Sequence, residues 1–261
     1  MGSTAAETNR IDLNADVGES FGPWPMGADE ALIPLVSSVN IACGAHAGDP
    51  GTLLQTVALA AAHGVAIGAH PGYPDLAGFG RRDLEMTPTD LRASLISQIG
   101  AIQAAARVAG TKVRHVKPHG ALYNRAARDP GVATTIAEAV RDLDPTLVLV
   151  GLAGSVSITA ARAAGLAVSE EAFADRRYEA DGSLRSRQLP GALLDPADAA
   201  AQALAIVREG RVRAGDGTRL AVRADTICIH GDSPDAVSIA RAVIAALGDA
   251  GILVAARSVD A

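Results

Sequence analysis

Aromatic residues, cysteines and long apolar runs are scarce in this chain. Only 3% of its 261 residues are aromatic although 49% are hydrophobic, so a buried core has to be built from Ala, Leu, Val and Ile. No apolar run reaches the roughly 18 residues that a membrane-spanning helix needs. The net charge of -6, without any cluster of Lys or Arg, argues against a nucleic-acid partner. We therefore expect a globular protein that binds neither membranes nor nucleic acid.

The two cysteines, Cys43 and Cys228, both fall in predicted strands. Reduced, buried cysteine is ordinary in the cytosol, so we expect no disulfide and a cytoplasmic location. The first ten residues lack the apolar segment of a signal peptide, and we expect residues 1–10 to form a disordered tail. Residues 11–261 are long enough for a single domain with one large core.

Near-continuous apolar runs alternate with Ala-rich segments. Such runs are typical of parallel strands that are covered on both faces. They begin at Ile11, Val39, Val65, Val113, Leu147, Ala167 and Thr226. The helices between them are predicted to start at an N-cap residue followed by proline, as in Asp49-Pro50, Thr87-Pro88, Asp129-Pro130, Asp195-Pro196 and Ser233-Pro234. Glycines that suit left-handed C-terminal caps follow them at Gly64, Gly110, Gly165, Gly210 and Gly248.

This alternation predicts an α/β fold. Two interruptions carry Asp-Gly turn signals, at Asp181-Gly182 within residues 178–188 and at Asp216-Gly217 within residues 212–222, and both are predicted β-hairpins. A closed barrel of about seven parallel strands fits best. An open, doubly wound sheet is the alternative, because the pattern alone separates the two poorly.

Polar side chains follow most of the predicted strands. In parallel α/β folds the carboxyl ends of the strands meet at the face that carries the active site. The residues found there are Asn14, Asp16, Glu19, His46, Asp49, His70, Arg81, Arg82, His115, Lys117, His119, Glu170, Glu171, Asp175, Arg176, Arg177, His230 and Asp232. A single histidine commonly makes only a structural hydrogen bond. Several histidines at one rim, together with Asp16 and Lys117, favour a polar active site instead.

This set of residues allows more than one chemistry. Aspartate and neutral histidines could bind a divalent metal and activate water, although no HxxxH or HExxH spacing is present. Asp16 and one histidine could equally form a metal-free base. Lys117 could stabilise an oxyanion. Arginines such as Arg81 and Arg176 could hold a carboxylate or phosphate, and Arg176 is preferred to Arg177 because neighbours in an extended segment point opposite ways.

No GxxxxGK[ST] phosphate-binding loop occurs in the sequence. The glycine turn at Gly151-Leu-Ala-Gly154-Ser155 has no lysine and is explained by helix packing. If the protein takes part in an ATP-driven reaction, the nucleotide does not have to bind to this chain.

The motifs at the strand ends resemble the LamB/YcsF family, the A subunits of prokaryotic 5-oxoprolinase. They read IDLNADVGESFG, VNIACGAHAGDP, IGAHPGYPDLAGFGRR, HVKPHGALYN, EAFADRRYEADGSLRSRQLPGALL and ICIHGDSP. The resemblance runs from about Ile11 to the last helix. One small departure is Ala172, where the family often has a larger aliphatic residue, but Glu171 and Asp175 stay in register.

The resemblance implies a (β/α)7 TIM-like barrel of the glycoside hydrolase/deacetylase type. It also implies a cytosolic enzyme that, with B and C partner subunits, opens 5-oxo-L-proline (pyroglutamate) to L-glutamate, with ATP as co-substrate bound mainly by those partners. A lactam is a poor electrophile, and phosphorylation of its amide oxygen would make the ring carbon attackable. Partners that supply this step would explain the missing phosphate loop.

On this interpretation the catalytic residues are Asp16, His46, His70, Lys117 and His119. The substrate-binding residues are Asn14, Glu171, Arg176, Arg81, His230 and Asp232. A divalent metal is not established; if one is bound, Asp16, His70 and His119 are the expected ligands. Two alternatives stay open: a stand-alone metal-dependent amide or sugar deacetylase, and a non-catalytic subunit that only delivers the lactam. Homo-oligomer formation is also left open.

Overall fold

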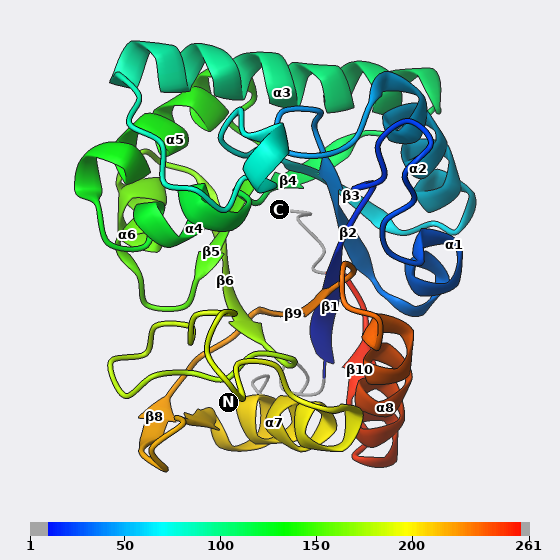
Figure 1. Cartoon of the computed structure of the whole chain (residues 1–261), viewed down its shortest axis with the longest axis vertical. Coiled ribbons are helices and arrows are strands. Elements are labelled where there is room, and N and C mark those ends of the chain that lie inside the picture. The colour runs from blue at the N-terminus through cyan, green and yellow to red at the C-terminus, as the bar shows by residue number, and fades with distance from the viewer. Residues whose placement is uncertain (1–9, 257–261) are drawn as a thin grey trace, which may run out of the picture.

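The computed structural model describes residues 10–256 and forms a closed, parallel β-barrel (Figure 1). Its strands are β1 (Arg10–Val17), β2 (Ser38–Ala42), β3 (Ala66–His70), β4 (Val113–Val116), β5 (Val148–Leu152), β6 (Ala167–Phe173) and β9 (Thr226–His230). They are hydrogen-bonded in the order β1-β2-β3-β4-β5-β6-β9, and β9 pairs with β1 to close the ring. The predicted barrel is confirmed, and the open doubly wound sheet is wrong.

Helices cover the outside of this ring (Figure 1). They are α1 (Asp29–Leu32), α2 (Pro50–Ala62), α3 (Pro88–Val108), α4 (Gly120–Ala126), α5 (Pro130–Leu143), α6 (Val156–Ala163), α7 (Pro196–Glu209) and α8 (Ala236–Asp249), with short 3-10 turns at Ile33–Leu35 and Leu76–Gly78. Among the helices that the structure describes, none combines the length and the apolar character needed to cross a bilayer.

The N-cap predictions hold for four of the five proline-initiated helices. The side chains of Asp49, Thr87, Asp129 and Asp195 each accept a hydrogen bond from a backbone N–H of the first turn. The prediction at Ser233-Pro234 is wrong, because α8 begins only at Ala236. The Ser233 carbonyl instead accepts a hydrogen bond from the Ala236 N–H and closes a turn in front of the helix.

Four of the five predicted glycine caps adopt the expected left-handed conformation. Gly64, Gly110, Gly165 and Gly210 have φ between 60° and 82°. Gly248 was expected to do the same but lies inside α8. The chain leaves that helix three residues later, at Gly251, where φ is 71°.

Both predicted hairpin turns pair antiparallel, but only the second has regular strands. Residues 212–222 contain β7 (Arg211–Arg213) and β8 (Arg219–Ala221), which pair antiparallel. Around Asp181-Gly182 the hairpin is reduced to a single antiparallel bridge between Tyr178 and Leu184, flanked by backbone hydrogen bonds from Glu179 to Ser183 and from Arg185 to Arg177. Tyr178 also forms a parallel bridge with Ala214. This segment is therefore held by several loops rather than by one partner strand.

Strands from both ends of the described chain meet at the start of β1. That strand begins at Arg10, one residue earlier than expected, and an additional short strand, β10 (Leu253–Val254), pairs with it. The rest of the tail predicted for residues 1–10 lies outside the described residues. The prediction of a single domain for residues 11–261 stays a prediction.

The interior of the barrel is polar, whereas the shell around it is apolar. Side chains alternate along a strand, so Asp12, Asn14 and Asp16 of β1 face one way while Leu13 and Ala15 face the other. All five are buried, and the two apolar residues belong to the hydrophobic core. At the amino end of the barrel, Asp12 accepts hydrogen bonds from Ser37, Ser38 and Thr226. The inward-facing polar side chains of the strands therefore form a buried, hydrogen-bonded column, which runs from Asp12 to the carboxyl-terminal rim of the barrel.

Candidate active site

Two buried asparagines form the layer beneath the site. Asn14 Nδ2 donates to Glu171 Oε1 at 3.0 Å and to Thr226 Oγ1 at 2.7 Å. Asn40 Nδ2 donates to Asn14 Oδ1 at 2.7 Å and to Asp16 Oδ1 at 2.8 Å. The amides thereby fix the orientation of the Asp16 and Glu171 carboxylates in the layer above.

Lys117 occupies the centre of the next layer and is 2% exposed. It follows β4, and its Nζ lies 2.9 Å from Asp16 Oδ1, 2.9 Å from Glu171 Oε1 and 3.0 Å from Cys228 Sγ. Burial alone would lower its pKa, but Asp16, Cys228 and Glu171 raise the pKa of Lys117 well above its usual value. The ammonium is therefore charged.

Asp16 is the anionic partner of this ammonium. Burial opposes ionisation of Asp16, but His70 and Lys117 hold the pKa of this carboxyl well below its usual value. Its second oxygen, Oδ2, lies 3.4 Å from His70 Nε2. Asp16 is thus a carboxylate at neutral pH, with one oxygen committed to Lys117 and the other facing an imidazole.

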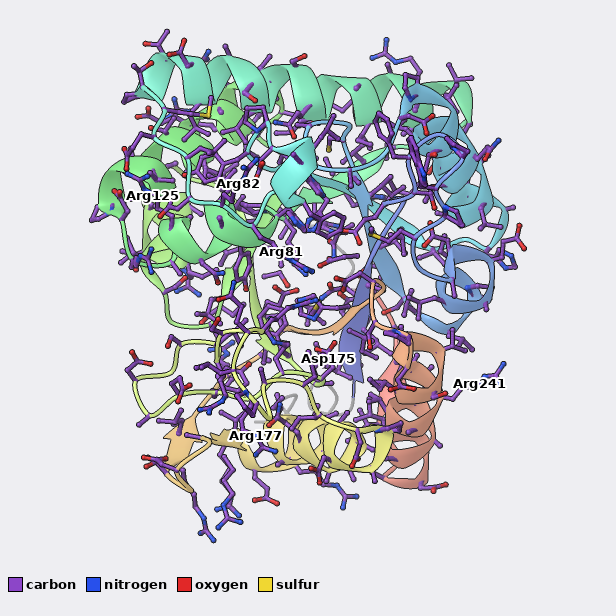
Figure 2. The ribbon with its side chains drawn as sticks, viewed as in Figure 1. Arg81, Arg82, Arg125, Asp175, Arg177 and Arg241 are labelled. Carbon is purple, nitrogen blue, oxygen red and sulfur yellow. The ribbon has the colours of Figure 1, made fainter. Side chains whose placement is uncertain are left out.

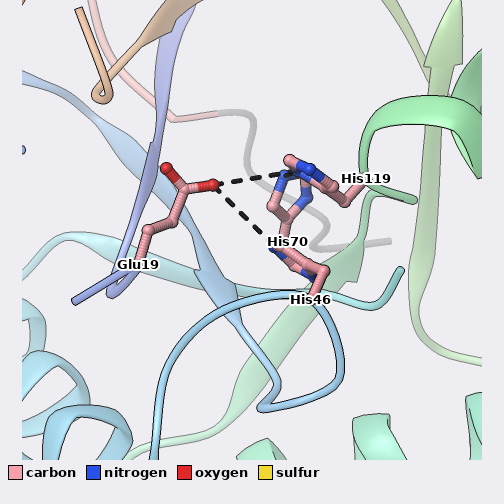
Figure 3. Close-up of side chains that lie close together, drawn as sticks. All are labelled: Glu19, His46, His70 and His119. Carbon is pink, nitrogen blue, oxygen red and sulfur yellow. Dashed lines mark hydrogen bonds and ion pairs between the residues drawn. The ribbon is translucent and has the colours of Figure 1, made fainter. Parts of the chain in front are cut away.

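Three imidazoles, those of His46, His70 and His119, lie close together, and Glu19 faces them (Figure 3). His70 Nε2 lies 3.0 Å from His119 Nδ1, and the His46 and His119 rings stack with centroids 3.8 Å apart. Glu19 Oε1 lies 3.8 Å from His46 Nε2 and 3.8 Å from His119 Nδ1. Burial lowers the pKa of His46 and His119 well below the usual value, so both rings are neutral near pH 7. Burial and the nearby Asp16 charge raise the pKa of Glu19.

Two glycines in the loop after β3 make room for these rings. A Cβ on Gly72 would lie 2.7 Å from His46 Nδ1. A Cβ on Gly80 would lie 2.7 Å from His119 Cδ2 and 2.8 Å from His46 Cβ. Gly80 also has φ of 63°, a conformation that other residues rarely adopt. The glycines of the GYPDLAGFG stretch therefore let the loop close over the histidines.

A cavity of about 400 Å³ opens above Lys117 and the histidines. Arg81 reaches toward its centre (Figure 2) and forms an ion pair with Asp232. Arg187 forms a second ion pair with Asp232, at 2.9 Å. Arg176 donates to the Arg185 carbonyl, while its buried Nε has no hydrogen-bond partner. These three guanidinium groups therefore lie in the cavity lining, and two of them pair with Asp232.

Burial also has the largest effect on the pKa of Arg176. It lowers the pKa of Arg176 to about 10, and the neighbouring Arg187 charge acts in the same direction. The side chain next to it in sequence has a different environment, because Arg177 lies over α7 (Figure 2), where it is 3.9 Å from Asp198. Arg82 likewise pairs with Asp75 outside the cavity.

The structure brings most of the predicted site residues to the cavity, but not all of them. Its lining includes Asp16, His70, Arg81, Lys117, His119, Arg176, His230 and Asp232. Asn14, Glu171 and His46 do not line it. Asn14 and Glu171 were predicted to bind substrate, and the structure places them below Lys117. Glu171 Oε1 accepts from Asn14 and lies 2.9 Å from Lys117 Nζ, whereas Glu171 Oε2 has no hydrogen-bond partner. Both are placed to orient Lys117, and their direct role in substrate binding stays a prediction.

His230 lies at the end of β9, beside Asp16 on the paired strand β1. Its Nδ1 lies 3.0 Å from Asp175 Oδ2, and its ring stacks on Phe173 with centroids 5.4 Å apart. His115, in contrast, points into the polar column, where its Nε2 lies 2.8 Å from Asn40 Oδ1. Burial lowers the pKa of His115 to about 3, so this ring is neutral.

The sequence reasoning assigned no role to Arg187 or Glu19. Arg187 belongs to the segment expected to be a hairpin, and nothing in the local pattern places it over the barrel mouth. Glu19 carried a usable signal, since it follows β1 at the same rim as Asp16. The two cysteines are free and buried, which confirms that they form no disulfide.

The whole barrel and its rim motifs have counterparts among known proteins. Residues 11–260 match the LamB/YcsF family. The chain belongs to this family. It is 55% identical over 247 residues to the A subunit of 5-oxoprolinase from Bordetella pertussis, a match that covers 94% of this chain and 98% of the relative.

Solved structures agree with this family membership. The lactam utilization protein from Thermus thermophilus matches with a TM-score of 0.90 and 52% identity, covering 95% of this chain and all of that one. The catalytic domain of peptidoglycan N-acetylglucosamine deacetylase from Eubacterium rectale matches with a TM-score of 0.52 and 9% identity, covering all of this chain and 94% of that one. At 9% identity this second likeness shows the fold alone. The LamB/YcsF barrel is thus shared with deacetylase-type proteins.

Proposed function

We propose that this chain is the A subunit of an ATP-dependent 5-oxoprolinase that cleaves 5-oxo-L-proline to L-glutamate in the cytoplasm. In this proposal the chain carries the ring-opening step and works with B and C subunits. The observation that supports it best is the Lys117–Asp16 ion pair, set beside neutral imidazoles at the base of an arginine-rich cavity. The names of the relatives, which specify a lactam utilization protein and the A subunit of 5-oxoprolinase, point to the same chemistry.

The arrangement of charges suits hydrolysis of an activated lactam. A five-membered lactam resists attack by water, and phosphorylation of its amide oxygen would provide a leaving group. The arginines at the mouth suit the substrate carboxylate or the added phosphate, because guanidinium groups bind both in a bidentate manner. In our proposal the partner subunits supply the phosphoryl step, and ATP binds mainly to them.

The residues below the mouth would then act on the ring carbon. Asp16, with His70 beside it, positions the attacking water and accepts its proton. Lys117 stabilises the negative charge that develops on the attacking oxygen as it bonds to the ring carbon. The proton that Asp16 accepts passes to the ring nitrogen as the C–N bond breaks, and His119, at the cavity surface, orients the ring for this transfer. The acyl phosphate formed in this way is hydrolysed by a second water to L-glutamate and phosphate. His46 does not line the cavity and acts on the other imidazoles.

The central test is release of glutamate from 5-oxo-L-proline and ATP by the purified chain, with and without the B and C subunits. Our proposal predicts release only when ATP and the partner subunits are present. Release of acetate from an N-acetyl sugar without ATP would favour the stand-alone deacetylase. Undiminished turnover of bound substrate when the rim residues are replaced would favour a non-catalytic delivery role instead.

Arg81→Gln is expected to raise the KM for the substrate about tenfold or more and to change kcat little. A hydrogen bond to a charged group is worth roughly 1.5–3 kcal/mol, and this one is made equally in the ground and transition states. Steady-state glutamate release measures both constants. Arg82→Gln is the matched control, because Arg82 adjoins Arg81 in sequence but pairs with Asp75 away from the cavity. Equal KM values in the two variants would remove Arg81 from substrate binding.

A further inference from the structure

The hydrogen bonds of His70 and His119 fix which ring nitrogen carries the proton. His70 Nδ1 lies 2.7 Å from the Lys117 carbonyl oxygen, and His119 Nε2 lies 2.9 Å from the Phe79 carbonyl oxygen. A carbonyl oxygen can only accept, so each of these nitrogens must be the donor. In a neutral ring the other nitrogen then has no proton. His70 Nε2 and His119 Nδ1 lie 3.0 Å apart, so with both rings neutral two unprotonated nitrogens would face one another.

Two lone pairs at this distance repel unless a cation lies between or beside them. A protein must therefore either keep one ring protonated or place a metal ion there. In metal sites a ligating histidine almost always donates its second nitrogen to a backbone carbonyl, a carboxylate or water, which is the pattern that both rings show.

His46 provides a second, independent observation. Its ring is 1% exposed, and neither Nδ1 nor Nε2 has a hydrogen-bond partner. A buried polar group without a partner costs about 1–3 kcal/mol. The same side chain has Nε2 directed at Glu19 Oε1, 3.8 Å away. A ligand in front of Nε2 would satisfy this ring.

The spacing of the four side chains suits one small ion. Tetrahedral zinc has bonds of about 2.0–2.1 Å to nitrogen and oxygen, which puts neighbouring ligand atoms about 3.3 Å apart. The separations here are 3.0 Å between His70 and His119 and 3.8 Å from Glu19 to each of His46 and His119. One ligand atom from each of the four residues lies within 4.8 Å of all the others.

We propose that Glu19, His46, His70 and His119 together bind one divalent transition-metal ion, with Zn²⁺ as the probe of that class. The His46 and His119 rings stack within 6° of parallel, so one of them has to turn to share the ion. His46, which no hydrogen bond restrains, is the ring that turns. This set shares His70 and His119 with the ligands expected from the sequence, but it replaces Asp16, whose Oδ1 is held by Lys117.

This inference goes beyond the proposed function because it concerns what the chain binds before any substrate arrives. Such an ion lowers the pKa of a bound water. His70 would then be a ligand, and Asp16, with Oδ2 only 3.4 Å from His70 Nε2, would be the group left to accept a proton.

The test is Zn²⁺ binding to the purified full chain after treatment with a chelator. Calorimetry should show one equivalent bound, the melting temperature should rise with added Zn²⁺ because only the native state has the site, and Co²⁺ should give the absorption of a low-symmetry site. His46→Ala and Glu19→Gln should each weaken binding by about 100-fold or more, since even the loss of a group that only orients a ligand costs 10–100-fold. His63→Ala, at the exposed end of α2, should leave binding unchanged.

Three results would overturn the proposal: no binding to the unmodified chain, binding unaffected by both ligand variants, or binding lost in Asp16→Asn but retained in Glu19→Gln. Glu19→Gln settles the question if His46→Ala fails to fold. Because the readout is metal affinity, failure here leaves the assay of ATP-dependent glutamate release untouched, and failure of that assay leaves the metal site untouched.

Discussion

Replacing Lys117 with methionine is expected to lower kcat for glutamate release about 1000-fold or more. Methionine has a similar length but no charge, so nothing would stabilise the negative charge on the attacking oxygen, and loss of one such donor typically costs 100- to 1000-fold. The loss should be larger here because Lys117 also holds Asp16 at 2.9 Å. Steady-state kinetics with the partner subunits present measures this effect.

Lys117→Met also leaves the Asp16 and Glu171 carboxylates buried without their counter-ion. Breaking a buried ion pair in this way costs about 3–5 kcal/mol of stability, so folding has to be checked by circular dichroism. The double variant Lys117→Met/Glu171→Gln removes one of the two unpaired buried charges, and it should regain stability without regaining activity.

Lys112→Met is the matched control for this experiment. Lys112 and Lys117 are the only lysines of the chain, and Lys112 is exposed just before β4, at the opposite end of the barrel. The control should retain full activity. Substantial glutamate release by a folded Lys117→Met variant would exclude Lys117 from the mechanism.

Asp16→Asn should reduce kcat about 100- to 10,000-fold, which is the usual contribution of a general base. The amide keeps the size of the carboxylate, and its oxygen can still accept hydrogen bonds from Asn40 and Lys117, so the layer below the cavity should keep its shape. What is lost is the ability to accept a proton from water. KM should change little because the arginines at the mouth hold the substrate. Glutamate release over a range of substrate concentrations separates the two constants.

Asp12→Asn tests whether the position of the carboxylate matters. Asp12 lies on the same strand and the same inward face as Asp16, but its partners are the hydroxyl groups of Ser37, Ser38 and Thr226 at the far end of the barrel. This variant should lose stability while its kcat stays near that of the unmodified chain. Comparable loss of kcat in both variants would mean that Asp16 acts through the fold rather than on water.

Much of this architecture follows from local signals in the sequence. All seven barrel strands lie where apolar runs predicted them, because strands covered on both faces need such runs. Four helices start at their predicted N-caps, where Asp or Thr precedes proline. Asp16, Lys117 and His119 could be assigned to one rim because the carboxyl ends of parallel strands meet there.

The sequence could not show how deeply each side chain is buried in the barrel or which way it points. Asn14 and Glu171 look like rim residues, yet the tilt and pairing of the strands bury them beneath Lys117. His46 lies only four residues beyond β2, but the loop carrying Gly72 and Gly80 covers it. Arg187 contacts Asp232, which lies 45 residues further along the chain, and no periodic sequence pattern predicts such a contact. Local sequence patterns therefore predict where the strands and helices lie, whereas long-range packing decides which side chains reach the cavity.

The polar column inside the barrel has a consequence for how this protein can vary. Each of its hydrogen bonds depends on one donor facing one acceptor. Replacing a single member, such as Asn40 by leucine, therefore leaves several neighbouring polar groups without a hydrogen-bond partner. The apolar outer layer has no such pairing rule, and swaps among Ala, Val, Leu and Ile can compensate one another by volume. A library of random variants should therefore retain folded clones with many changes between strands and helices, and almost none with changes along the barrel axis.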